Sequence, residues 1–242
     1  MTACGRSGSK YIGFCEGDDY WTDPLKLQKQ VDFLEANPDF SMCFSAVDII
    51  DEMGRNWDYK MYFPDMGKDV FTIEDFILSG MSIIPTPTLL CRNLFPEPVP
   101  QFFVARSGDI GIQVFMADKG KAKCFSEKMA IYRNHSGGIT KSQEHMKKAN
   151  DDLMELFHLL NEYFGFRYNA IFRKRFFDNA RVSLTFGIRD KKGIGRIRQY
   201  FKVMPDYVKY SDKINFKEMA YYHTLIFFPF ILKLFKSRTT VL

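Results

Sequence analysis

The sequence predicts an α/β domain followed by an α-helical extension, and three observations support this prediction. Hydrophobic residues make up 46% of the 242 residues, which is enough for a sizeable buried core. In the first part of the chain, apolar runs of strand length alternate with segments of helical periodicity. From about Ser142 the strand signals fade while the helical pattern continues. We therefore expect a mixed sheet with helices over residues 1–141 and helices alone over residues 142–242.

The first strand and the first helix are the most sharply marked elements. Residues 10–15 form an apolar run, and Asp23-Pro24 marks a helix start because proline is favoured at the first helical position. This helix is expected to end at Asn37-Pro38, since proline disfavours helical backbone in the residue before it. Further strands are expected over 40–50 and 82–91, a loop over 55–70, a hairpin-like return over 122–133, and helices over 72–78, 108–119, 143–163, 166–186 and 191–203.

The formal net charge of +5 is unevenly distributed, because lysine and arginine dominate after about Lys119. Their clusters are short and lie in segments with helical periodicity. These segments contain no recognisable nucleic-acid-binding module, so we expect no nucleic-acid partner. A solvated helix face and an anionic membrane surface both stay open as explanations. The apolar stretch 219–234 is shorter than the ~20 residues that span a bilayer and contains His223, Pro229 and Lys233, which favours a packed or interfacial helix.

The cysteines indicate a reducing compartment. They are widely spread, odd in number and form no Cys-x-x-Cys pair. We expect reduced and mostly buried thiols at Cys4, Cys15, Cys43, Cys91 and Cys124. The first residues lack the apolar core of a signal peptide. Together these observations predict a cytoplasmic protein, with peripheral association at the inner face of the cell membrane as an option.

Three carboxylates follow the first predicted strand directly: Glu16, Asp18 and Asp19. In open α/β sheets, ligands bind at the carboxyl ends of the strands. Carboxylate oxygens are suitable ligands for a hard divalent cation such as Mg²⁺ or Mn²⁺. The alternative for the carboxylates alone is an acidic turn that caps the next helix.

The surrounding segment, KYIGFCEGDDYWTDPLKLQKQVDFLEANPDF, resembles the family 2 glycosyltransferases of bacterial surface-polysaccharide synthesis. That family has a short strand, an Asp-any-Asp type motif, an aromatic pair and a helix that begins near Asp-Pro. Here Glu16-Gly17-Asp18 occupies the motif, with glutamate in the first position. The resemblance implies a GT-A fold and a divalent cation, with Asp18 as metal ligand and Glu16 and Asp19 at the donor. It also makes Trp21 a candidate for stacking on the donor.

Two later motifs match the same family in the same order. Asp109 follows Ser107-Gly108 at a predicted helix start, where an N-cap role is the alternative. The resemblance implies that Asp109 is the catalytic base, and a helix N-terminus favours its charged form. The turn from Tyr132 to Gly138 resembles the family's Tyr-Arg-any-His turn, which implies that Arg133 and His135 bind the diphosphate and that His135 can also bind the metal.

The segment between these motifs is expected to line the acceptor side by the same resemblance. Its candidate acceptor-binding residues are Thr86, Thr88 and Arg92. The alternative is an edge strand that Pro85 and Pro87 protect from aggregation.

The resemblance implies an inverting enzyme that transfers a sugar from a nucleotide-diphospho-sugar to a glycan or lipid-linked acceptor. In the family, a nucleotide-binding half precedes the acidic motif, whereas here the motif begins at Glu16, so we expect the front of that half to be missing. The alternative is an inactive glycosyltransferase remnant that acts as a peripheral membrane or glycan-binding protein. The hypothesis of an active glycosyltransferase requires that Asp18, Asp109 and His135 converge around one cavity.

Overall fold

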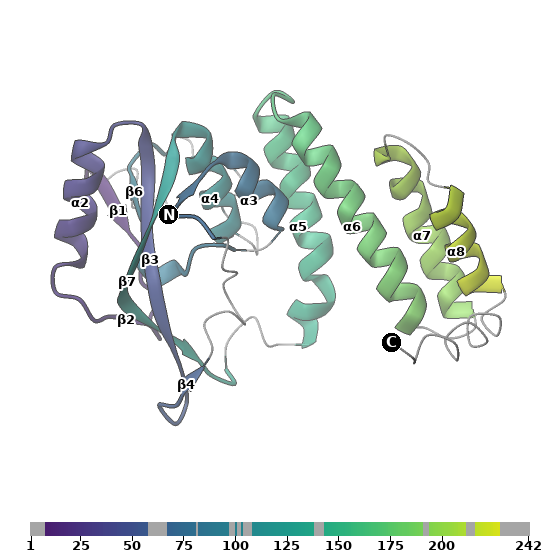
Figure 1. The fold of residues 1–242 in the computed structure, drawn as a ribbon, viewed down its shortest axis with the longest axis horizontal. Helices are drawn as coiled ribbons and strands as arrows, with labels where there is room; N and C mark the ends of the chain where they lie inside the picture. Colours follow the sequence, from purple (N-terminus) through teal and green to yellow (C-terminus); the bar gives the residue numbers. More distant parts are fainter. Residues whose placement is uncertain are drawn as a thin grey trace. The chain divides into compact units, whose positions relative to one another are not determined.

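The chain forms two compact units, residues 1–167 and residues 168–242. The structure, a computed structural model, describes residues 8–57, 67–80, 82–96, 100, 103, 108–137, 143–190, 194–211 and 216–227. The first unit is mixed α/β and the second is helical, as the sequence predicts (Figure 1). The boundary falls one helix later than the predicted residue 141, because α5 (Gln143–Tyr163) belongs to the first unit. There the Tyr163 ring lies 6.1 Å from the ring of Phe115.

Among the described residues, a seven-stranded mixed sheet forms the centre of the first unit. Its main path runs β1-β6-β3-β7-β2, while β4 pairs with β3 and β5 pairs with β7. The strands are β1 (Tyr11–Gly13), β2 (Tyr20–Trp21), β3 (Phe40–Asp51), β4 (Asn56–Trp57), β5 (Val70–Phe71), β6 (Leu90–Arg92) and β7 (Lys121–Asn134). The predicted loop over 55–70 therefore contains β4 and the first residue of β5, and residues 58–66 lie outside the described part of the chain.

Strand direction brings three chain segments to one edge of the sheet. β3 and β7 are parallel, and β6 is antiparallel to both β1 and β3. β1 therefore runs in the same direction as β3 and β7. Their carboxyl ends meet at one edge, where open α/β sheets bind ligands.

The predicted hairpin over 122–133 is wrong, because these residues lie within the single strand β7. The polar residues Ser126 and Glu127 suggest a turn, but they form an irregularity in the pairing with β3. Ser45 pairs with Phe125, and the next residue, Ala46, pairs with Lys128. The two extra residues are accommodated as a bulge, which leaves the direction of the strand unchanged.

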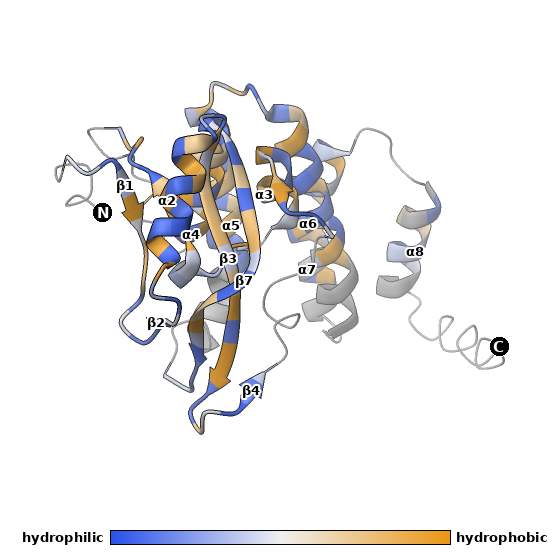
Figure 2. Ribbon diagram, turned by 60° about the vertical axis from the view of Figure 1, so that its left-hand side comes forward, coloured by the Kyte–Doolittle hydropathy of each residue, from blue (hydrophilic) through white to orange (hydrophobic). Residues whose placement is uncertain are grey.

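Helices cover both faces of this sheet, with α2 (Lys26–Ala36) on one side and α3 (Ile73–Ser79) and α4 (Gly108–Lys119) on the other (Figure 1). Adjacent residues of a strand face opposite sides. Cys43 packs with Leu34 of α2, while Phe44 contacts Phe71 at 5.5 Å between ring centroids. Because both faces are covered, the central strands carry long apolar stretches (Figure 2).

Local signals account for most of the remaining elements of the first unit. The predicted helix over 72–78 is α3, and Thr72 and Asp75 form a capping box at its start. The predicted strand over 82–91 is wrong in its first part. There Pro87 lies within a short 3-10 turn, η2 (Thr86–Thr88), and only Leu90–Arg92 pair as a strand.

The described part of the second unit contains α6 (Asn169–Asp190), α7 (Ile194–Tyr210) and α8 (Phe216–Phe227). Its core is formed by Ala180, Leu184, Tyr200, Val203, Tyr207 and Tyr222. Within the apolar stretch 219–234, residues up to 227 belong to α8, where Tyr222 is fully buried, and residues 228–234 lie outside the described part. None of the helices among the described residues is long and apolar enough to cross a bilayer.

Arg92 ties the end of α2 to the start of β3. Its Nε donates to the Phe40 carbonyl at 2.9 Å, and its Nη2 donates to the carbonyls of Leu34 and Asn37. The Leu34 and Asn37 carbonyls lie at the C-terminal end of α2, where partners within the helix are missing. The Arg92 guanidinium therefore holds the fold together, and its predicted acceptor-binding role stays a prediction.

We predict that Arg92→Met lowers the free energy of unfolding by about 2–3 kcal/mol, because it removes charge-assisted hydrogen bonds to partly buried carbonyls. Urea unfolding followed by circular dichroism measures this change. Lys10→Met is the control, because Lys10 pairs with Glu35 at the exposed surface and its loss should leave the midpoint nearly unchanged. Equal midpoints for the Arg92 and Lys10 variants would refute a structural role for Arg92.

Candidate active site

The acidic loop begins where β1 ends and returns to the sheet as β2. The backbone N–H of Asp19 donates to the Glu16 carbonyl at 3.1 Å, which closes the turn. β2 then pairs with β7, with Tyr20 opposite Ile131. This pairing brings the carboxylates beside the end of β7, where the residues of the third motif are located.

The three carboxylates form one compact group. Glu16, Asp18 and Asp19 each offer an oxygen, and these oxygens all lie within 4.8 Å of one another. Asp19 is buried at 8% exposure, and its Oδ1 accepts a hydrogen bond of 2.8 Å from the backbone N–H of Arg133. No N–H or O–H donor among the described residues reaches its buried Oδ2. A buried carboxylate oxygen without a donor is costly unless a cation or a shared proton faces it.

His135 contacts Asp18 directly. Its Nε2 lies 2.7 Å from Asp18 Oδ2. This hydrogen bond is the main reason why the pKa of Asp18 falls below its ordinary value. His135 lies outside the carboxylate group itself, so it is placed to orient Asp18, in the way that outer partners orient metal ligands. Its predicted role as a direct metal ligand stays a prediction.

Glu16 responds most strongly to its neighbours. Burial first, and then the charges of Asp19, Asp18 and Asp109, raise the pKa of Glu16 to about 7. The effect of Asp109 on Glu16 shows that the first and second motifs lie within electrostatic reach of each other.

Asp109 occupies the first turn of α4. Gly108 is required before it, because a Cβ at that position would lie 2.9 Å from the Phe103 carbonyl oxygen. One turn later, the buried Gln113 accepts from the Ile83 backbone N–H at 3.2 Å and donates to the Ser82 hydroxyl at 2.7 Å. Gln113 thereby fixes α4 against the segment that leads to η2.

The group fits a hard divalent cation. Such an ion takes carboxylate oxygens at about 2.0–2.6 Å, so two ligands on opposite sides lie roughly 4–5 Å apart. The 4.8 Å spread of the three oxygens is compatible with that spacing. An ion there would also face the buried Asp19 Oδ2 and remove the repulsion that raises the pKa of Glu16.

The predicted acceptor residues do not gather in one place. Thr88 is fully buried and donates its hydroxyl to the Pro85 carbonyl at 2.8 Å, so its proposed contact with an acceptor is corrected. Arg92 pairs with Tyr11, at the opposite end of β1 from the acidic loop. Thr86 is half-buried at the start of η2 and keeps part of its surface available.

Trp21 links the acidic loop to η2. Its indole N–H donates to the Pro87 carbonyl at 2.8 Å, and the Lys26 ammonium lies 4.6 Å from its ring centroid. The side chain is still 38% exposed. Stacking on a donor therefore stays a prediction, while the indole N–H already has a structural partner.

Sequence reasoning missed two buried polar residues on α2. Lys26 is 1% exposed and donates to Gln30 Oε1 at 2.8 Å, and Gln30 in turn donates to the Thr88 carbonyl at 2.8 Å. Lys26 and Gln30 are one helical turn apart, a spacing that is also common for exposed polar residues. The sequence therefore does not indicate that these two are buried. Together with Trp21, they hold η2 beside the acidic loop.

Similarity to known proteins gives no function. No protein-family model matches the chain. Uncharacterized proteins of Mycobacterium bovis and Mycobacterium tuberculosis, named Mb1547 and Rv1520, are each 33% identical to it over 139 residues. The match covers 54% of this chain and 36% of each relative, so it spans about a third of the length of these curated relatives.

We predict that Mn²⁺ binds with an affinity that rises roughly tenfold per pH unit below pH 7 and then levels off, because the cation displaces one proton. Without metal, the pKa of Glu16 is raised from 4.5 to about 7, so the folded state holds a proton that the unfolded chain has lost. Protonated Glu16 therefore favours the folded state. This contribution to the free energy of unfolding is complete below pH 4.5 and is lost as the pH rises through about 7. Calorimetry with Mn²⁺ between pH 5.5 and 8 measures the affinity.

Glu16→Gln should flatten this pH dependence and weaken Mn²⁺ binding. Glu74→Gln, which changes an exposed residue of α3, should leave both unchanged. Absence of Mn²⁺ binding at pH 8, or pH-independent binding, would contradict the proposed cation site.

We also predict that the fluorescence of Trp21 titrates with a midpoint near pH 8. Burial lowers the pKa of Lys26 from 10.5 to about 8, while Cys43 and Cys15 raise it. The unfolded chain binds this proton up to about pH 10.5, so stability rises between the two values. Trp57→Phe leaves Trp21 as the sole reporter, since the chain has 2 tryptophans. Lys26→Met in that background should abolish the transition, and its persistence would exclude Lys26 as the titrating group.

Proposed function

We propose that the chain provides the catalytic site of an inverting, metal-dependent glycosyltransferase that uses a nucleotide-diphospho-sugar. The observation that carries the proposal is the 2.7 Å contact between His135 and Asp18, which forms one group with Glu16 and Asp19. It joins two motifs that are far apart in the chain at the carboxyl ends of parallel strands. The resemblance to family 2 glycosyltransferases rests on the same motifs in the same order.

The carboxylates have a defined part in this proposal. Asp18, Asp19 and Glu16 would hold a divalent cation, Mg²⁺ or Mn²⁺. When bound, the cation would neutralise charge on the departing diphosphate. His135 would keep the Asp18 carboxylate in position through its Nε2. Arg133, whose charge lowers the pKa of Asp18, would assist in binding the diphosphate.

Asp109 is the proposed base. In an inverting transfer, the acceptor hydroxyl attacks the anomeric carbon from the side opposite the leaving diphosphate and loses its proton as it does so. A carboxylate of Asp109 would accept that proton at an oxygen. The first turn of α4 favours the charged carboxylate, which is the form that can act as a base.

The acceptor and the location follow from the same resemblance. We propose a glycan or lipid-linked acceptor in surface-polysaccharide synthesis, and a cytoplasmic site at the inner face of the membrane. Of the predicted acceptor-binding residues, Thr86 and Arg92 are half-buried, while Thr88 is buried. The uncharacterized mycobacterial relatives are neutral on this proposal.

We predict that Asp109→Asn lowers kcat by about 10²–10⁴-fold and leaves the Kd of the donor within about twofold, because it removes only the base. Asp18→Asn should instead weaken donor binding through the cation. The control is Asp32→Asn, an exposed aspartate on α2 that should change neither constant. Calorimetry with a panel of UDP- and GDP-sugars in Mn²⁺ identifies the donor, and transfer assays then give kcat.

Two outcomes would overturn the proposal. If no nucleotide-sugar binds in the presence of Mn²⁺, the site does not serve sugar transfer and the remnant alternative is favoured. Normal turnover by the Asp109→Asn variant would show that another group is the base.

A further inference from the structure

Helix α7 of the second unit carries two apolar faces. Its inner face contributes Tyr200, Val203 and Tyr207 to the core of that unit. Its outer face exposes Ile197, Phe201 and Val208, which keep 36%, 64% and 44% of their surface accessible. A surface helix of a globular protein normally carries polar residues on its outer side.

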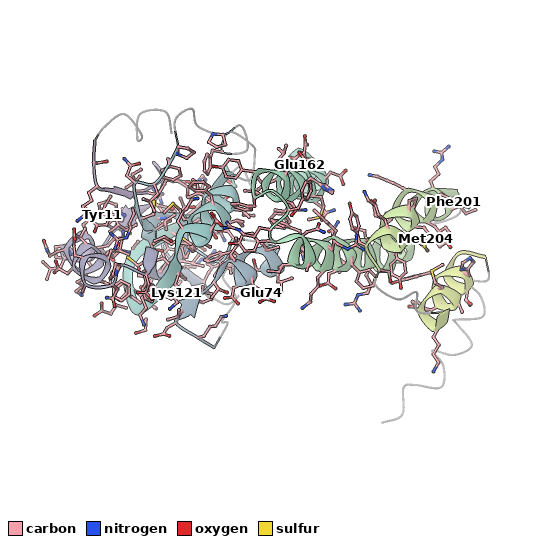
Figure 3. The ribbon with its side chains drawn as sticks, turned by 90° about the horizontal axis from the view of Figure 1, so that it is seen from above. Tyr11, Glu74, Lys121, Glu162, Phe201 and Met204 are labelled. Carbon is pink, nitrogen blue, oxygen red and sulfur yellow. The ribbon has the colours of Figure 1, made fainter. Side chains whose placement is uncertain are left out.

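The outer apolar residues form one continuous stripe. Ile197, Phe201, Met204, Pro205 and Val208 recur at intervals of three and four, which places them on one side of the helix. Figure 3 labels Phe201 and Met204 on this helix. Beside them is an open hollow of about 500 Å³, lined by Tyr200, Phe201, Met204, Pro205, Val208 and Lys209. We call this surface the α7 stripe.

Positive charge accompanies the α7 stripe. The helix carries four basic residues and one acidic residue, Asp206. The basic residues are Arg196, Arg198, Lys202 and Lys209. Arg198, Lys202 and Lys209 are exposed. An apolar face with large side chains, combined with lysine and arginine, is typical of helices that lie in the interface of a bilayer.

Charge separates the candidate partners of the stripe. A second copy that docked through the same face would bring the same basic residues together. The terminal segment 228–242 of this chain carries Lys233, Lys236 and Arg238 and no acidic residue, so it also repels α7. An anionic bilayer offers acyl chains for Phe201 and Val208 and negative headgroups for the cations.

We propose that the α7 stripe docks the protein on the surface of an anionic lipid bilayer, with α7 parallel to the membrane plane. The location differs from the one that the sequence predicts, because the stripe lies on α7 and not in the stretch 219–234. The inference stands apart from sugar transfer, since it uses none of the residues of the candidate active site. Docking at a membrane would bring the enzyme to lipid-linked acceptors if the proposed function is correct.

Vesicle flotation of the full chain tests the proposal. We expect at least tenfold more binding to vesicles of phosphatidylcholine with 30% phosphatidylglycerol than to phosphatidylcholine alone, and a decline as salt increases. Phe201→Glu combined with Val208→Glu should lower binding to anionic vesicles by about tenfold or more. Each substitution places a negative charge on the face of α7 that would enter the bilayer. Both residues are exposed, so the variant should keep its melting temperature.

A control and a second variant separate the contributions. Met53→Glu combined with Leu94→Glu adds the same charge at exposed apolar residues of the first unit, and its binding should stay within about twofold of wild type. Lys202→Gln combined with Lys209→Gln keeps the stripe and should remove most of the preference for anionic vesicles.

Three results would overturn the proposal. The first is unchanged flotation of the Phe201 and Val208 double variant. The second is loss of flotation on Leu234→Glu combined with Phe235→Glu, which would assign binding to the terminal segment. The third is a wild-type dimer that the Phe201 and Val208 variant converts to a monomer, which would make the stripe an interface between two copies. Mn²⁺ and donor binding should be unaffected by every variant here, so failure of this proposal is distinct from failure of the proposed function.

Discussion

The parallel pairing of β3 with β7 is the constraint on which the candidate site depends. It extends from Phe40 and Lys121 to Asp51 and Asn134, so the end of β7 is fixed relative to the centre of the sheet. β2 pairs with the same strand, and β1 shares its direction through β6. The loop between β1 and β2 is therefore held at the carboxyl edge beside the turn that carries His135. The acidic loop owes its position to backbone hydrogen bonds rather than to attraction between its side chains, which repel one another.

That repulsion indicates a site that binds a cation. Like charges close together raise the free energy of the folded state, and proteins retain such arrangements mainly at functional sites. Glu16 reduces the repulsion between the carboxylates by holding a proton near neutral pH, since its pKa is raised to about 7. Asp18 is stabilised by its hydrogen bond with His135, and Asp19 by the hydrogen bond that it accepts from the Arg133 backbone N–H. The buried Lys26 ammonium lies 4.6 Å from the Trp21 ring centroid and donates to Gln30.

Local signals in the sequence predicted the elements that depend on local chemistry. The strand at Tyr11, the capping box at Thr72 and the start of α4 near Gly108 follow from apolar runs and cap residues. The acidic loop and His135 were predicted as partners by resemblance, and the structure places them in contact. β7 was misread as a hairpin because a bulge and a turn both place polar residues in a strand. The buried position of Thr88 and the structural hydrogen bonds of Arg92 were not predicted, because hydrogen bonds to backbone carbonyls leave no pattern in the sequence.

A crystal structure of the full chain grown with Mn²⁺, with anomalous diffraction data at the manganese edge, tests the central claim most directly. The account predicts one strong anomalous peak about 2.0–2.6 Å from carboxylate oxygens of Asp18 and Asp19, with His135 still bonded to Asp18. A map without a peak at this group, or with manganese bound only elsewhere, would contradict it.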